Sequence, residues 1–315
     1  MTRDRQPVRA HAVELRHLRY FVATAEELHF GRAAERLRIA QPGLSQQIRT
    51  LEALVGTALF HRTRRSVELT LAGELFLAEA RKTLEQAERT VLVAQQAGRG
   101  ERGRIEIGYV ASAAYTGVLT SLFSAFRKTH PQVDLRFMEM EMSRQLDTMH
   151  DGKLDIAFIR PPVELPAGVA AVTILREPVI LAISCEHPLA RHDRIPLAEL
   201  SRDSFITPHH APGVSFHEHT VAACGRVGFV PRIAHQGRDF TTIASMVAVG
   251  LGVALVPRSL RCIQLPGVLY RPIADTEVWA NLAVAFRRTE RSAATQALIR
   301  QARDFVMPTE PDAAP

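Results

Sequence analysis

The sequence predicts an α/β protein in two parts: an all-α N-terminal domain with a small β-wing, then a two-lobed α/β body. Three observations support this class. Residues 31–55 have the pattern of two short helices joined by a tight turn, residues 71–97 form one long amphipathic helix, and strands alternate with helices from residue 104 onward. A length of 315 residues is enough for two or three domains, and a hydrophobic content of 46% is typical of globular proteins.

The N-terminal domain begins with a helix over residues 15–27, which follows a leader of 13 residues. Its apolar stripe can pack beneath the next two helices, the first of which we expect Gly31 to cap. Pro42 fits the first turn of the second helix of the pair, and Gly56 is expected to end it. On that helix one face is apolar, formed by Leu44, Ile48, Leu51 and Val55.

The opposite face of this helix is polar. It carries Pro42, Gln46 and Arg49, with Ser45 on its flank. Amides and guanidinium groups read base edges in the major groove of DNA, whereas hydroxyls and cations contact phosphates. An ordinary solvated helix has the same pattern, so this helix alone leaves both interpretations open.

Residues 59–70 predict a β-wing, in which two short strands flank a turn with Arg62, Arg64 and Arg65. Such a wing could bind phosphates or enter the minor groove, although three arginines could equally form a solvated loop. Charge favours the first interpretation: residues 1–104 hold 18 Lys+Arg against 12 Asp+Glu, while the remainder is neutral.

Residues 71–97 are expected to form a helix capped by Thr70, with Leu77, Leu84 and Val91 one heptad apart and alanines between them. A narrow apolar seam predicts a dimerisation helix. The alternative is a long helix packed on its own domain. Residues 97–103 contain three glycines and predict a linker.

The body predicts a doubly wound, parallel sheet in each lobe. For the first lobe we expect strands at 104–110, 133–139 and 155–160 and helices at 116–129 and 143–151. For the second we expect strands at 179–184, 204–207, 231–235 and 253–256 and helices at 214–224 and 240–249. A further strand (279–286) and a last helix (292–306) follow, and the chain crosses between lobes near 161–178 and 270–277.

Nearly the whole chain resembles a LysR-type transcriptional regulator. The most specific matches are residues 18–73, LRYFVATAEELHFGRAAERLRIAQPGLSQQIRTLEALVGTALFHRTRRSVELTLAG, and the segments GKLDIAFIR and GLGVALVP. The body also resembles the subgroup that controls catabolism of aromatic compounds.

The resemblance implies a winged helix-turn-helix DNA-binding domain (14–70), a linker and dimerisation helix (71–97) and an effector-binding domain (104–308) similar to periplasmic binding proteins. Lobe I would comprise 104–161 and 276–306, and lobe II 178–270. It also implies a bacterial homodimer or homotetramer that binds double-stranded DNA. Matching positions give the expected DNA contacts, which are Arg32, Gln41, Pro42, Ser45, Gln46, Arg49, Arg62, Arg64 and Arg65.

A small effector is expected beyond the carboxyl ends of the strands. Residues at those ends are Ser112, Met142, Ser143, Arg160, Pro208 and His209. Hydroxyls, a cation and apolar walls favour an organic acid, aromatic or derived from ring cleavage. Alternatively, the two serines are only helix caps and Arg160 a structural ion pair.

No catalytic or cofactor motif is present, and the histidines at 209, 210, 217 and 219 lack a zinc-binding spacing. We therefore expect no enzyme, no metal and no cofactor. Three scattered cysteines, expected to be reduced and mostly buried, and the lack of a signal peptide or membrane span predict a cytoplasmic protein. The competing function is a small-molecule binding protein or enzyme with an accessory N-terminal domain, which DNA filter binding would distinguish.

Overall fold

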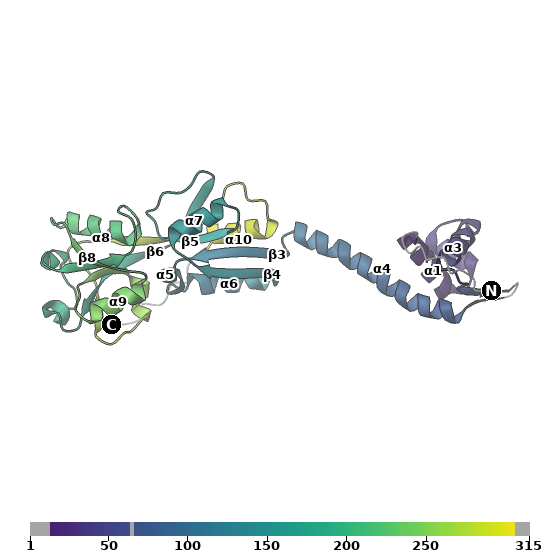
Figure 1. The fold of residues 1–315 in the computed structure, drawn as a ribbon, viewed down its shortest axis with the longest axis horizontal. Coiled ribbons are helices and arrows are strands. Elements are labelled where there is room, and N and C mark those ends of the chain that lie inside the picture. The colour runs from purple at the N-terminus through teal and green to yellow at the C-terminus, as the bar shows by residue number, and fades with distance from the viewer. Residues whose placement is uncertain (1–12, 64–65, 306–315) are drawn as a thin grey trace, which may run out of the picture. The chain divides into compact units, whose positions relative to one another are not determined.

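The N-terminal part of the chain folds around three helices: α1 (Leu15–Glu27), α2 (Phe30–Leu37) and α3 (Gln41–Val55). The computed structural model describes residues 13–63 and 66–305. It separates into two compact units, residues 1–95 and 96–315 (Figure 1). In the first unit the predicted apolar face of α3 is confirmed, because Leu44, Ile48 and Leu51 are fully buried against Phe21.

The ends of these helices follow from local chemistry. The side chain of His29, not Gly31, caps α2: its Nδ1 accepts hydrogen bonds from the backbone N–H groups of Gly31 and Arg32, at 3.0 and 3.2 Å. The prediction of Gly31 as the cap was therefore wrong, because an imidazole nitrogen accepts these bonds and a glycine has no side-chain acceptor. Pro42 lies in the first turn of α3, and Gly56 ends that helix at a φ of 78°, both as predicted.

A two-stranded wing and a long helix complete this unit. Strands β1 (Phe60–Arg62) and β2 (Val67–Leu69) pair antiparallel. Helix α4 (Leu71–Gly98) follows at once, and the Thr70 hydroxyl accepts a hydrogen bond from the N–H of Gly73 at 2.9 Å. A Cβ on Gly73 would lie 2.1 Å from the carbonyl oxygen of Leu59. Glycine is therefore required where α4 approaches the wing.

Lobe I of the second unit is built on β3 (Arg102–Tyr109), β4 (Gln132–Glu139), β5 (Ile156–Ile159) and β11 (Trp279–Arg287). Alternate residues of β5 point to opposite faces of this sheet. Ile156 and Phe158 enter the core beneath α6 (Val118–Thr129) and α10 (Ala293–Arg303). Ala157 and Ile159 instead pack against α7 (Met142–His150) on the other face.

One strand joins the two lobes. The sixteen residues of β6 (Val169–Ser184) pair with β11 in lobe I and then with β9 (Ala254–Pro257) and β10 (Val268–Arg271) in lobe II. The resulting order is β10-β6-β11-β5-β3-β4, with β9 also on β6. Lobe II adds the parallel pair β7 (Ser204–Pro208) and β8 (Arg232–Gly237), together with α8 (Ser215–Arg226) and α9 (Phe240–Ala248). Short 3-10 turns, η2 (Pro188–Arg191), η3 (Leu197–Leu200) and η4 (Arg258–Cys262), connect these elements.

The two-lobed α/β class is confirmed, with three refinements. Strands β3, β4 and β5 are parallel, but β11 pairs antiparallel with both β5 and β6, so the sheet is mixed. The strand predicted at 179–184 begins ten residues earlier, and β10 was not predicted. The helix predicted at 116–129 is confirmed as α6, which begins after Gly117 (φ 75°), and the short α5 (Ala111–Ala114) before it was not predicted.

Candidate functional site

The front of α3 is an exposed polar surface. The side chains of Gln41, Pro42, Gln46 and Arg49 are exposed, and Ser45 is half-buried beside them. Within the described residues, the side chains of Gln46 and Arg49 have no hydrogen-bond or ion-pair partner. Donors and acceptors that are free in the protein alone can bind another molecule without first breaking an internal contact.

Two arginines of the expected DNA surface are engaged within the domain. The exposed Arg32 pairs with Glu27, its Nε lying 3.3 Å from the carboxylate. Arg62 is only 26% exposed and lies 2.5 Å from Glu52 of α3, and its guanidinium covers the ring of Phe30 at 5.0 Å. Glu52 also accepts hydrogen bonds from the backbone of β1. Arg62 therefore ties the wing to α3, a structural role that the arginine pattern did not indicate. Arg64 and Arg65 lie outside the described residues.

The heptad positions of α4 divide into two groups. Leu77 and Leu84 are half-buried and pack against the core of their own domain, whereas Val91 is 58% exposed. Leu77 and Leu84 thus make contacts within their own domain, as the alternative interpretation expected, whereas Val91 is exposed, and the role of all three in dimerisation stays a prediction. Leu92 is also exposed, and a groove of about 320 Å³ runs between Leu15 of α1 and this end of α4.

In the second unit, residues from both lobes surround a cavity of about 90 Å³. Four of the six residues expected to bind an effector line it, namely Ser112, Met142, Arg160 and Pro208. Ser143 and His209 are exposed and do not line it; Ser143 points away because the adjacent Met142 takes the buried position at the start of α7. The imidazole that does line the cavity is His210, with Ser215 and Phe240 of lobe II.

The charged centre of this cavity is Arg160, which is 2% exposed. Its Nη2 lies 2.8 Å from a carboxylate oxygen of Glu177, and its Nε donates to the Ser112 hydroxyl at 3.2 Å. Its Nη1 is buried and has no hydrogen-bond partner within the described part of the chain. Burial lowers the pKa of Arg160, and the Glu177 carboxylate raises it. Nη2 of Arg160 therefore makes the structural ion pair, while Nη1 of the same guanidinium is the candidate ligand contact.

Contacts between the lobes close around the cavity. The Tyr115 hydroxyl in lobe I lies 3.0 Å from the Thr241 hydroxyl in lobe II. The backbone N–H of Ser215 donates to the carbonyl of Pro162 at 2.8 Å, and Ser215 has a left-handed φ of 49°. A serine in this conformation is strained, and such strain is often found at ligand sites.

Two comparisons with known proteins decide the family. The model of the bacterial regulatory helix-turn-helix protein, lysR family, matches residues 15–74, and that of the LysR substrate binding domain matches residues 98–306. The chain belongs to the LysR family of transcriptional regulators. It is therefore a DNA-binding regulator with an effector domain, and not an enzyme.

Individual relatives agree with this family. The uncharacterized HTH-type transcriptional regulator YnfL of Escherichia coli K12 is 39% identical, over 85% of this chain and 91% of its own. BenM, an HTH-type transcriptional regulator of Acinetobacter baylyi, is 32% identical over 95% and 99%. The structure of full-length CbnR complexed with its target DNA has a TM-score of 0.80 at 28% identity, covering 93% of this regulator and 99% of that chain.

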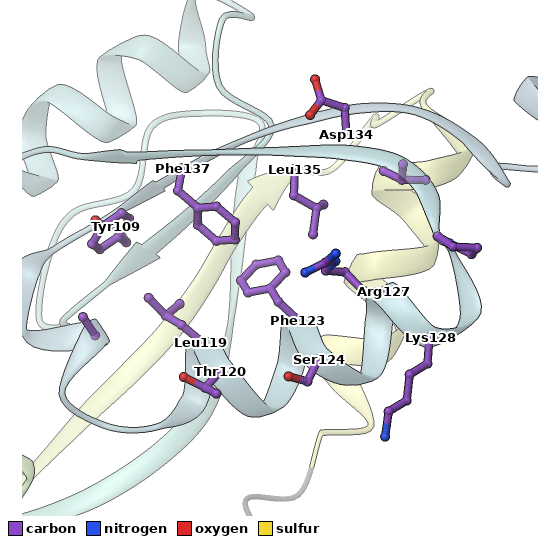
Figure 2. A pocket seen from close by; sticks show the side chains of 13 residues that line it. Tyr109, Leu119, Thr120, Phe123, Ser124, Arg127, Lys128, Asp134, Leu135 and Phe137 are labelled. Atoms are coloured by element: carbon purple, nitrogen blue, oxygen red, sulfur yellow. The ribbon is translucent and has the colours of Figure 1, made fainter.

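The regulator also carries a groove on lobe I that the sequence did not indicate. It has a volume of about 800 Å³ and lies between α6 and β4, the edge strand of the large sheet. Figure 2 shows Phe123 of the helix and Phe137 of the strand pointing toward one another, and their rings lie 4.8 Å apart. Arg127, Lys128 and Asp134 lie toward one end. Period-2 analysis of β4 places Phe137 on the same face as the buried Val133, so it does not indicate that Phe137 is exposed.

Other features of the regulator are simpler. Within the described residues, no group of three or more His, Cys, Asp or Glu side chains could hold a metal ion. None of the described helices is long and apolar enough to cross a membrane. Of the cysteines only Cys224 is buried, and burial raises its pKa to about 12; Cys185 and Cys262 are exposed, contrary to expectation.

Proposed function

We propose that this regulator reads promoter DNA with the exposed front of α3, and that a small organic acid in the cavity at Arg160 changes how it does so. Gln46 and Arg49 contact base edges, because their side chains are exposed and uncommitted. We expect phosphate contacts from Ser45, Gln41, Pro42 and Arg32, and also from Arg64 and Arg65, which lie outside the described residues. Arg62 contributes by holding the wing against α3.

The observation that carries the effector proposal is the free Nη1 of Arg160. A buried donor without a partner costs about 1–3 kcal/mol, more when it is charged, so a ligand that supplies an acceptor gains that energy. Ser112 stands beside it, and Met142 and Pro208 provide apolar wall. A carboxylate is the acceptor that best matches a guanidinium. On this proposal Ser143 and His209 make no direct contact.

We propose further that the regulator assembles at least as a homodimer, and as a homotetramer when the effector units also pair. Exposed apolar side chains at Val91, Leu92 and Leu15 line one groove and support the first interface. The groove at Phe123 and Phe137, beside the unpaired edge of β4, supports the second. DNA binding and reduced, scattered cysteines together support a cytoplasmic location.

Binding at the cavity would act through the lobes. A ligand shifts the population of lobe arrangements by no more than its differential affinity for them. In an oligomer this shift changes the spacing of paired α3 helices and therefore which half-sites, about 34 Å or multiples apart, are bound together. We expect a change in footprint or bend that is larger than the change in overall affinity.

The test combines two assays on the full chain. A thermal-shift screen of organic acids identifies the effector, because saturating ligand at about 100 times its Kd adds about 2.7 kcal/mol of stability. Genomic fragments that the protein retains in filter binding are then footprinted with DNase, with and without the same acid. An acid that raises the thermal midpoint and alters the footprint supports the proposal. Stabilisation without any change on DNA would contradict the coupling, and no DNA retention would contradict the recognition surface.

A further inference from the structure

The cavity that surrounds Arg160 is small. Its volume of about 90 Å³ is well below that of a 150 Å³ protein cavity that accommodates benzene. Benzene has six heavy atoms, and an aromatic acid adds three more. By this comparison the cavity accommodates about four non-hydrogen atoms, the size of acetate, and propionate is one atom larger.

The charges around the cavity limit the ligand further. Glu177 pairs with Nη2 of Arg160, and within the described residues Nη1 is a buried donor without a hydrogen-bond partner. The other lining residues include three carboxylates, Glu139, Glu141 and Asp239, against a single further cation, Arg238. A second carboxylate on the ligand would therefore lie near like charges, which disfavours its ionised form.

The remaining wall is apolar. Met142 is 2% exposed and lies against Arg160, since its sulfur is 3.2 Å from the backbone nitrogen of that residue. Phe240 of α9 lines the cavity from lobe II and packs edge-on against Phe216 at 4.8 Å. One or two methyl or methylene groups fit this wall without an unsatisfied polar atom.

We infer that the effector is a short aliphatic monocarboxylate, with its carboxylate on Arg160 Nη1 and Ser112 and its alkyl end between Met142 and Phe240. This inference rests on the proposed organic-acid function and narrows it. It replaces the aromatic acid that the sequence suggested. A chain of this size also lets the lobes stay in the contact that Tyr115 and Thr241 make.

The experiment measures the thermal midpoint of the full-chain protein with five probes at equal pH and ionic strength. These are acetate, propionate, propionamide, benzoate and succinate. We expect saturable stabilisation by acetate and propionate. Propionamide, benzoate and succinate should bind about tenfold more weakly or worse. Propionamide lacks the negative charge, benzoate exceeds the size of the cavity, and succinate adds a second carboxylate.

The outcomes separate the two proposals. If benzoate or succinate binds more tightly than propionate, this inference is overturned while the organic-acid function stands. If none of the acids shifts the midpoint or the footprint of a protein that still binds DNA, the organic-acid function itself fails.

A paired substitution tests the size argument directly. Met142→Ala enlarges the cavity and should improve benzoate relative to propionate by about tenfold or more. Met138→Ala is the matched control, because Met138 is an exposed methionine of β4 in the same lobe and does not line the cavity. An unchanged benzoate-to-propionate ratio in a folded Met142→Ala protein would overturn the assigned wall. Should that variant not fold, the five-probe panel on the native protein decides alone.

Discussion

The DNA-reading surface and the effector cavity use the same chemistry in opposite surroundings. On α3, Gln46 and Arg49 are exposed and have no partner within the described residues. In the cavity, Arg160 is nearly inaccessible and makes an ion pair, a hydrogen bond and a contact with an aromatic ring. Exposed groups contribute little to folding and much to binding, whereas a buried charge contributes to both. Substitutions on α3 should therefore change DNA binding without changing stability, whereas substitutions at the cavity should change both ligand binding and stability.

The largest effect is expected where the buried pair is broken. Glu177→Gln leaves the Arg160 charge buried without its carboxylate and should lower the free energy of unfolding by about 3–5 kcal/mol. Chemical denaturation of the full chain measures this. Glu79→Gln, which removes the exposed partner of Lys82, is the control and should change nothing measurable. Equal stability of both variants would show that the buried ion pair contributes no more to folding than the exposed one.

Removal of an exposed apolar side chain from α4 should weaken assembly next. Val91→Ser deletes an isopropyl group from the proposed interface, at about 1.5–3 kcal/mol per protomer for full burial. Sedimentation at several concentrations should show a shift toward monomer. Val230→Ser, at a position that is 87% exposed in the other unit, should leave the mass distribution as it is. If the Val91 variant dissociates no more than this control, that end of α4 does not form the interface.

Substitution on the recognition surface should change specificity without changing stability. Gln46→Ala removes one base contact, and we expect it to reduce discrimination at one base pair by about 1–3 kcal/mol. Binding to a library of operator variants measures this. Gln86→Ala, an exposed glutamine of α4, is the matched control. An unaltered base preference would place Gln46 outside the groove.

Two histidines near the lobe boundary should give the smallest effect, a pH dependence of stability. Burial lowers the pKa of His210 and of His219 below the ordinary 6.5. The unfolded chain therefore binds more protons than the folded chain between 6.5 and the lowered values, so stability should fall as pH decreases through that window. Each unit of lowering corresponds to about 1.4 kcal/mol.

Denaturation midpoints between pH 7.5 and 5 test this dependence. His210→Gln should flatten the profile, while His192→Gln, at an exposed position, should not. For His210 the groups to consider are Glu141, which raises its pKa, and His209 and His217, which lower it. A steeper loss of stability in the His210 variant would contradict the assignment.

The same contrast explains what the sequence could predict. The face of α3 follows from a local period, so Leu44, Ile48 and Leu51 were correctly assigned to the core and Gln46 to the surface. The cavity depends on which strand ends meet, and a general rule for open sheets found four of its residues. Both predictions rest on the positions of helices and strands along the chain, which the sequence pattern shows.

Most of what the sequence did not show depends on contacts between residues that are far apart in the chain. Glu177 lies on β6, whose first half was not predicted as a strand, so the partner of Arg160 could not be named. Arg62 stays a predicted DNA contact, but the sequence does not show that Glu52 lies beside it. His210 rather than His209 lines the cavity, and a strand end alone does not determine which of two adjacent side chains turns inward.

The most direct measurement takes one substitution from each region and assays each variant for both DNA recognition and the response to the acid. Gln46→Ala and Ser112→Ala proteins are titrated with the acid that most raises the native thermal midpoint, and each is footprinted with and without it. We expect Gln46→Ala to keep the thermal response and lose base preference, and Ser112→Ala to keep the ligand-free footprint and lose the response to the acid. If Ser112→Ala responds to the acid as the native protein does, or if it no longer binds DNA without ligand, the separation of an exposed reading surface from a buried effector cavity is contradicted.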